Sequence, residues 1–191
     1  MPALIGFGFW LSLVIGIVFL GLYSHRVASE KRSMSEALLA TQMALAREQT
    51  LRWVDMAIDN GIDLGFEGSD EPIMIRGQHL LLGEALNNLI DNALRYTPSP
   101  GRITVSLSKH QRQVILAVED SGPGIAQDER ERVFDRFYRV LGSRAEGSGL
   151  GLAIVKEIAV RHHAKIQITD AHIKPENGCG ARFEILFLAI A

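Results

Sequence analysis

The chain has 191 residues, of which 47% are hydrophobic and 22% charged, with a formal net charge of -2 and one cysteine. This composition excludes a disordered chain and a disulfide-stabilised one. Because 20 Lys and Arg residues are balanced by 22 Asp and Glu residues, nucleic acid is not expected as a partner.

The first 24 residues form an uncharged, apolar stretch. A helix of ~20 residues reaches roughly 30 Å, the thickness of the hydrocarbon layer of a bilayer. Arg26, Lys31 and Arg32 follow this stretch, so the positive-inside rule places the rest of the chain in the cytoplasm. We therefore expect a single-pass transmembrane helix over 1–24 in the inner (cytoplasmic) membrane. A cleaved signal peptide is the alternative, and the lack of a basic start disfavours it.

Residues 25–50 precede the predicted folded domain. They carry an incomplete apolar stripe, including Leu38, Leu39 and Leu45, without Gly or Pro, which predicts a helical linker that needs a partner. From residue 51 onward, short apolar runs are separated by Gly and Pro, so the folded domain is predicted over 51–191.

Within this domain, the longest periodic segment is 78–96, which predicts a helix ended by Pro98 and Pro100. Runs rich in β-branched residues predict a hairpin of two strands, 102–108 and 113–120. The other predicted elements are strands at 62–66, 72–75, 165–170 and 182–188 and helices near 128–137 and 149–162. This grouping predicts an α/β fold, a two-layer α+β sandwich in which helices cover one face of a mixed sheet.

One face of the helix over 78–96 is polar. Glu84, Asn88 and Asn92 are spaced by four residues and therefore share that face. An exposed polar face explains Glu84 by itself. Asn92 is a poor helix former in the middle of the helix, which favours a role facing a ligand.

The sequence has two glycine-containing segments, one directly after a predicted strand and one at the start of a predicted helix. In DSGPG (120–124), Asp120 can accept a hydrogen bond from an exocyclic amine, and Gly122 and Gly124 let the backbone pass close to a flat ring. Taken alone, this segment is a turn. GSGLGL (147–152) opens a helix, an arrangement suited to phosphate, although a single glycine loop is weak evidence.

Four segments, in order, are similar to the sequence boxes of the histidine-kinase catalytic domain in the GHKL ATP-binding superfamily. The resemblance covers about residues 52–188 and implies a Bergerat-type ATP-binding fold with bound ATP and Mg²⁺. The segments are NNLIDNALRYTP (87–98) for the asparagine box, DSGPG (120–124) and GSGLGL (147–152) for the two glycine boxes, and VFDRFYRV (133–140) for the phenylalanine box.

The resemblance implies a role for each matching residue. Asp120 would hold the adenine amino group, and Tyr96 would pack near the nucleoside. Asn92 would ligate Mg²⁺ between the phosphates, with Asn88 assisting one turn earlier. Arg95 would neutralise phosphate.

The loop between Phe137 and Gly147 would be the ATP lid, with Arg139 and Arg144 as candidate phosphate contacts. The residues that would contact the phosphates through this lid and its hinge are Gly147, Gly149, Leu150 and Gly151. The residues expected to contribute to catalysis are Asn88, Arg95 and Arg144.

In the ATP-hydrolysing branches of this superfamily, the position one turn before the metal-binding Asn resembles a Glu that activates water. Asn88 stands at that position here and cannot usefully accept a proton. We therefore expect ATP to be bound but hydrolysed slowly, with Glu84 as a distant substitute base.

The family's phosphoacceptor His box is not recognisable. His25 is followed by Arg26, and His79 precedes the asparagine-box helix, so neither matches. MALARE (43–48) resembles the tail of the second helix of the family's dimerisation hairpin. The resemblance thus implies transfer to a His of another chain, such as a full-length kinase or a separate hairpin domain. A response regulator is the expected partner, and homodimerisation is left open.

Three hypotheses follow. The first is a membrane-anchored histidine protein kinase of a two-component system, which transfers the γ-phosphoryl group of ATP to a His in trans. The second is a nucleotide-binding module without transfer. The third is an anti-sigma-type Ser protein kinase, which the apolar N-terminal stretch and the phenylalanine box disfavour.

Overall fold

The computed structural model describes residues 26, 45–68, 73, 75, 77–140, 148–172 and 179–189. From Thr41 onward the chain forms one compact unit. Residues 45–52 are helical. The elements that follow are α2 (Val54–Asp59), β1 (Ile62–Gly68), α3 (His79–Tyr96), β2 (Gly101–His110), β3 (Gln113–Asp120), a 3₁₀ turn η1 (Arg132–Phe134), α4 (Gly151–Arg161), β4 (Lys165–Asp170) and β5 (Ala181–Leu188).

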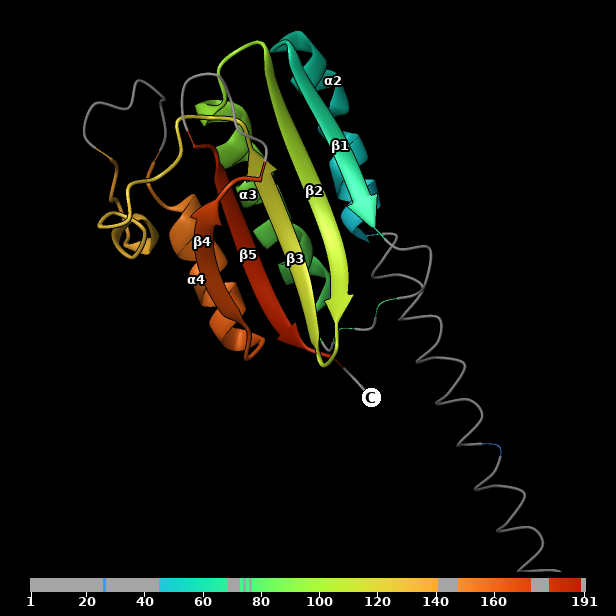
Figure 1. The fold of residues 1–191 in the computed structure, drawn as a ribbon. Helices are drawn as coiled ribbons and strands as arrows, with labels where there is room; N and C mark the ends of the chain where they lie inside the picture. Colours follow the sequence, from blue (N-terminus) through green and yellow to red (C-terminus); the bar gives the residue numbers. More distant parts are fainter. Residues whose placement is uncertain are drawn as a thin grey trace, which may run out of the picture. The chain divides into compact units, whose positions relative to one another are not determined.

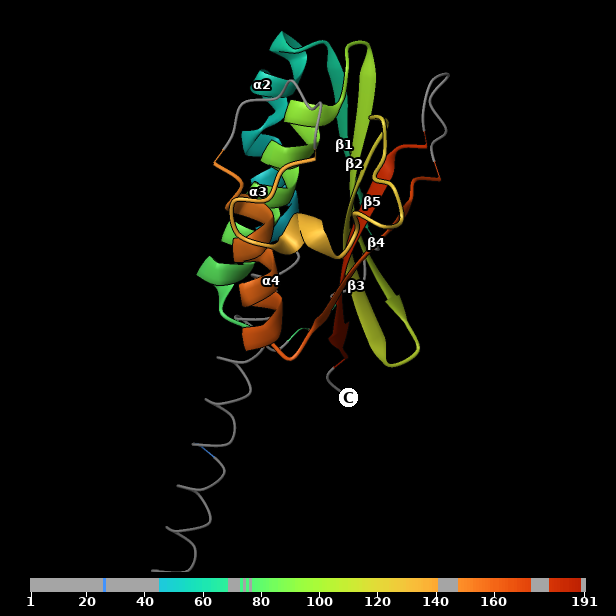
Figure 2. The same ribbon diagram turned by 90° about the vertical axis from the view of Figure 1, so that its left-hand side faces the viewer.

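The strands form one five-stranded sheet in the order β1-β2-β3-β5-β4 (Figure 1). β1 is parallel to β2, and the other neighbouring pairs are antiparallel. In the described part of the chain, the helices all lie on one face of the sheet (Figure 2). The predicted mixed sheet with helices on one face is confirmed.

Alternating burial along the strands decides which side chains face the helices. In β2, Ile103, Val105 and Leu107 are buried and their neighbours are partly exposed, because successive side chains of a strand point to opposite faces. In β3, the same periodicity places Val118 and Asp120 on the helix side. The last residue of β3 is therefore a carboxylate on the core face of the sheet.

Helix α3 crosses this core. Its apolar side chains recur at helical spacing and are buried, and α4 packs beside it. The helix ends at Tyr96: Thr97 is already extended, at φ -85 and ψ 118, as expected for a residue before proline. The asparagine-bearing face of α3 therefore lies next to α4 and to the carboxyl end of β3.

Two predicted elements differ from the structure. Ile73 and Ile75 are buried but lie in no strand; the rest of the strand predicted at 72–75 is outside the described residues. Alternating apolar residues indicate burial on one side, and residues outside a strand can be buried in the same way. The helix predicted near 128–137 is only the 3₁₀ turn η1. Phe137 has a φ of 65, which an α-helix does not allow.

The transmembrane helix predicted for 1–24 lies outside the described residues. Within the described part of the chain, no helix has the length and apolar character needed to span a bilayer. Of the predicted linker over 25–50, residues 45–50 are helical, and Leu45 and Ala46 are buried in the domain core. The boundary at residue 51 stays a prediction.

Candidate functional site

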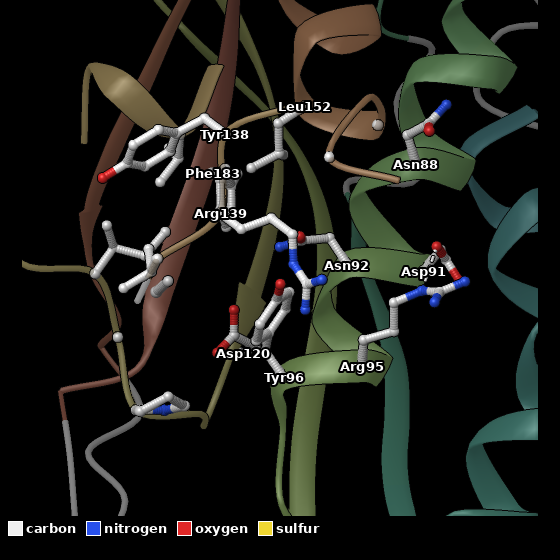
Figure 3. Close-up of a pocket in the computed structure, with 18 of the residues that line it drawn as sticks. Asn88, Asp91, Asn92, Arg95, Tyr96, Asp120, Tyr138, Arg139, Leu152 and Phe183 are labelled. Atoms are coloured by element: carbon white, nitrogen blue, oxygen red, sulfur yellow. Dashed lines mark hydrogen bonds and ion pairs between the residues drawn. The ribbon is translucent and has the colours of Figure 1, made fainter. Parts of the chain in front are cut away.

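A cavity of about 430 Å³ lies between α3, the start of α4 and the ends of β3 and β5 (Figure 3). Its polar lining comes mainly from α3, from Asp120 and from the segment after η1. Its apolar lining was not anticipated from the sequence and includes Ile125, Ala126, Val133, Tyr138, Leu152 and Phe183. An apolar cleft with a few placed polar groups is the usual form of a small-molecule site.

Asp120 is the buried carboxylate of this cavity, with 4% of its surface exposed. The N–H of Gly122 donates a hydrogen bond of 2.8 Å to its Oδ1, and the N–H of Ala181 donates another. Burial raises the pKa of Asp120 to about 6, against the opposing effect of these two donors, and the nearby Glu119 raises it slightly further. A buried acceptor of this kind suits a ligand that presents an N–H donor.

The turn after Asp120 requires its glycines. A β-carbon on Gly122 would lie 2.9 Å from the carbonyl oxygen of Tyr96, and one on Gly124, whose φ is +78, would lie 2.9 Å from that of Gly180. Both glycines thus allow close backbone packing. Gly124 lines the cavity, whereas Gly122 does not and instead orients the Asp120 carboxylate.

The polar face of α3 forms the opposite wall. Asn92 is half-buried and its amide points into the cavity (Figure 3). The Asn88 amide N–H group donates to the Glu84 carbonyl at 2.8 Å and to Glu84 Oε1 at 3.1 Å. A β-carbon on Gly151 would lie 3.0 Å from Asn88 Oδ1. Asn88 therefore connects α3 with the start of α4.

Arg95 lines the cavity at its exposed rim. Its Nε lies 2.7 Å from Oδ2 of Asp91, one turn earlier, and both side chains are partly exposed. Sequence reasoning did not anticipate this pair, although the i, i+4 spacing of opposite charges on a helix would have indicated it. A phosphate that binds Arg95 competes with this ion pair.

The cavity ends at the amino terminus of α4. Gly149 and Gly151 line it, and α4 begins without a side-chain cap. The first N–H groups of a helix have no partner within the helix and carry the positive end of its dipole. The Leu150 carbonyl accepts from the Ile154 N–H, and Leu150 is not a lining residue among those described. This end of the cavity suits an anion.

The segments on either side of residues 141–147 meet at the cavity. The Phe137 N–H donates a hydrogen bond of 2.8 Å to the Gly149 carbonyl. Next to it, the Tyr138 hydroxyl donates to Glu129, and Arg132 lies 4.5 Å from the centre of the Tyr138 ring. The hydrogen bond to Glu129, followed by burial, raises the pKa of Tyr138. These contacts hold the end of the VFDRFYRV segment against the cavity.

The cavity brings together most of the residues expected from the sequence. Arg139 and Tyr96 line it as well, and Figure 3 shows both side chains within it. Arg144 and Gly147 lie outside the described residues. The expected residues that line the cavity are Asn88, Asn92, Arg95, Tyr96, Asp120, Gly124, Arg139, Gly149 and Gly151.

The residues present fit a magnesium ion that is held mainly by a bound phosphate. No group of three or more His, Cys, Asp or Glu side chains suited to a metal occurs among the described residues. Mg²⁺ prefers oxygen ligands and commonly takes one or two from the protein and the rest from phosphates and water. The amide oxygen of Asn92, on the cavity wall between Asp120 and α4, is of the required type.

Comparisons with known proteins agree with this geometry. The sensor histidine kinase CusS of Escherichia coli O157:H7 is 42% identical over 134 residues, which are 69% of this chain and 26% of CusS. The chain therefore spans about a quarter of that relative.

Two solved structures share the fold. The mycobacterial sensor histidine kinase MprB superimposes with a TM-score of 0.66 at 29% identity, covering 78% of this chain and 94% of that one. Full-length ShkA in complex with AMPPNP superimposes with a TM-score of 0.65 at 28% identity, covering 78% of this chain and 30% of that one. Residues 77–190 match the family of histidine kinase-, DNA gyrase B- and HSP90-like ATPases. The chain belongs to this family.

Proposed function

We propose that this chain binds Mg-ATP and acts as a histidine protein kinase of a two-component system, transferring the γ-phosphoryl group to a His of another chain. The observation that supports this most directly is the pairing, in one cavity, of the buried Asp120 carboxylate with the amino terminus of α4. One end suits the adenine amino group and the other suits phosphate. AMPPNP, the ligand in the ShkA structure, is an ATP analogue that contains both groups.

Different residues of the cavity contact different parts of the nucleotide. Asp120 accepts the hydrogen bond of the adenine amino group, and the apolar lining, including Phe183 and Ile125, excludes water from the ring. The N–H groups at the start of α4 and the Arg139 guanidinium meet the phosphates. Asn92 would supply an oxygen ligand to Mg²⁺, which neutralises phosphate charge when bound.

Transfer requires little covalent chemistry from the protein. A lone pair of the acceptor imidazole forms a bond to the γ-phosphorus, the bond from that phosphorus to the bridging oxygen breaks, and ADP leaves. This chain holds the γ-phosphoryl group in line for that attack. Water is a poor competitor because Asn88, rather than a carboxylate, stands one turn before Asn92, and Glu84 is hydrogen-bonded to Asn88.

We further propose that the apolar residues 1–24 anchor the chain in the inner membrane, with the kinase domain in the cytoplasm and a response regulator as the partner that receives the phosphoryl group. The support is the sequence pattern of this stretch and the likeness to sensor kinases such as CusS.

The test uses the full chain in nanodiscs with γ-labelled ATP, supplemented with the hairpin domain of a related kinase. We expect label in the added hairpin domain, lost in acid and retained in base, as phosphohistidine requires. Calorimetry with AMPPNP measures binding separately. Binding without transfer to any protein would favour a nucleotide-binding module, and absence of both would refute the proposal.

A further inference from the structure

Glu119 is a buried charge directly beside Asp120. Because side chains alternate along β3, Glu119 points to the face of the sheet opposite the cavity. Its side chain is 5% exposed. A buried carboxylate is costly unless charged or polar partners satisfy it.

Both oxygens of Glu119 have partners from distant parts of the sequence. The backbone N–H of His172 donates to Oε1 at 2.8 Å. Arg182 Nη1 lies 2.8 Å from Oε2, and His172 Nδ1 lies 3.1 Å from the same oxygen. His172 follows β4 and Arg182 is the second residue of β5, so this one carboxylate on β3 contacts both the start of β5 and the segment after β4.

The anchored residues are next to those that orient Asp120. Ala181, which precedes Arg182, donates its N–H to the Asp120 carboxylate. Gly180 donates its N–H to the Gly122 carbonyl at 3.1 Å. Arg182 thus directly follows the two residues whose N–H groups contact Asp120 and the turn after it.

We propose that Glu119 is a positioning residue for recognition of the nucleobase: through Arg182 and His172 it holds Gly180 and Ala181 where they orient Asp120 and the turn that follows it. This rests on the proposed ATP binding. Glu119 lies on the other face of the sheet, so it acts on the base only through these residues.

Glu184 is a matched control for a purely structural role. It is also a carboxylate bound to Arg182, with Oε1 2.8 Å from Nε, and its side chain is 12% exposed. Its other oxygen accepts from Gln167 at 2.6 Å. Glu184 lies farther along β5 from Ala181, and among the described residues its carboxylate bonds to Arg182 and Gln167 rather than to His172. Its loss therefore weakens the same network without releasing the donors to Asp120.

The experiment measures the affinity of the full chain for ATP and for inorganic tripolyphosphate, by calorimetry, in Glu119→Gln and Glu184→Gln variants. We expect Glu119→Gln to lower the affinity for ATP roughly tenfold, which corresponds to the loss of about one hydrogen bond to a charged group. The affinity for tripolyphosphate should stay unchanged. Glu184→Gln should leave both affinities unchanged. Hydrogen exchange at the Ala181 amide should accelerate only in Glu119→Gln.

An equal loss of affinity for both ligands in Glu119→Gln, or an unchanged affinity for ATP, would overturn the positioning role. Should Glu119→Gln fail to fold, His172→Ala removes one exposed donor to Glu119. This variant should lower the affinity for ATP about threefold without changing the affinity for tripolyphosphate. An unchanged affinity for ATP would overturn the inference. If the wild-type chain binds no ATP, the proposed function fails, and the exchange measurement still tests whether Glu119 positions Ala181.

Discussion

The backbone N–H of Phe137 donates a hydrogen bond of 2.8 Å to the carbonyl of Gly149. This bond joins the VFDRFYRV segment to the glycine segment that begins α4, at the edge of the cavity. Gly149 has a φ of +68, and a β-carbon there would lie 2.8 Å from the Cα of Phe137. The contact therefore depends on glycine.

Gly149→Ala should disrupt this junction. We expect a loss of about 1–3 kcal/mol of unfolding free energy from the left-handed backbone and the steric contact, with weaker ATP binding because α4 can no longer begin at the same place. Denaturant unfolding and calorimetry measure the two effects. Gly65→Ala is the control, because a β-carbon there meets nothing within 4 Å. Equal effects in both variants would contradict the role of the junction.

Asp120→Asn should weaken recognition of the base without weakening recognition of the phosphates. The substitution places an amide donor where the carboxylate accepted hydrogen bonds, so we expect ATP affinity to fall far more than tripolyphosphate affinity. Competition calorimetry with both ligands gives the comparison. If the two affinities fell by the same factor, Asp120 would not be the residue that reads the base.

The raised pKa of Asp120 predicts a pH dependence of stability. The pKa of Asp120 is about 6 in the folded chain, against an ordinary value of 3.8 for an aspartate in water. Between these two pH values the folded state therefore binds the proton more tightly than the unfolded state does. The contribution of Asp120 to stability is fully present below about pH 4 and is lost as the pH rises through about 6, by roughly 3 kcal/mol.

Asp120→Asn lacks this titration. The difference in unfolding free energy between the wild-type chain and the variant should therefore change between about pH 4 and 7 and level off above that range. Urea unfolding at several pH values, without nucleotide, measures it. A difference independent of pH would mean that burial does not raise this pKa.

Asn92→Ala should remove the dependence of ATP binding on Mg²⁺. The amide oxygen of Asn92 is the metal ligand that we propose on this wall of the cavity, and alanine has no oxygen to replace it. Calorimetric titration with and without MgCl₂ measures the dependence. Asn60→Ala is the control, because Asn60 is exposed and its side-chain amide donates to the carbonyl of Met56, one turn earlier. An unchanged Mg²⁺ dependence in Asn92→Ala would place the metal elsewhere.

Local periodicity was sufficient for the main features of the site. The four-residue spacing of Asn88 and Asn92 predicts a shared helix face, and both line the cavity. The apolar run at 113–120 predicts a strand that ends at Asp120, and the structure places Asp120 at the end of β3, where it is buried. Which side chains share a face of a helix or strand depends only on residues close together in the sequence, so it can be predicted without knowing the rest of the fold.

Local patterns were insufficient where burial or tertiary contact decides the conformation. The apolar residues Ile73 and Ile75 are buried but belong to no strand. The charged segment near 128–137 is a 3₁₀ turn, held by Tyr138 against Glu129. A short helix has too few internal hydrogen bonds to prevail over such contacts.

The sequence by itself predicted the two-layer fold from the periodicity of its segments, and the family and the candidate nucleotide-binding residues from the resemblance of four short segments to the family's boxes. Only the tertiary structure decided how these groups are held. Glu119 and Arg182 are 63 positions apart, and Phe137 and Gly149 meet across a segment between them. Such pairs leave no periodic trace in the sequence, because they form only when the sheet and helices bring distant residues together.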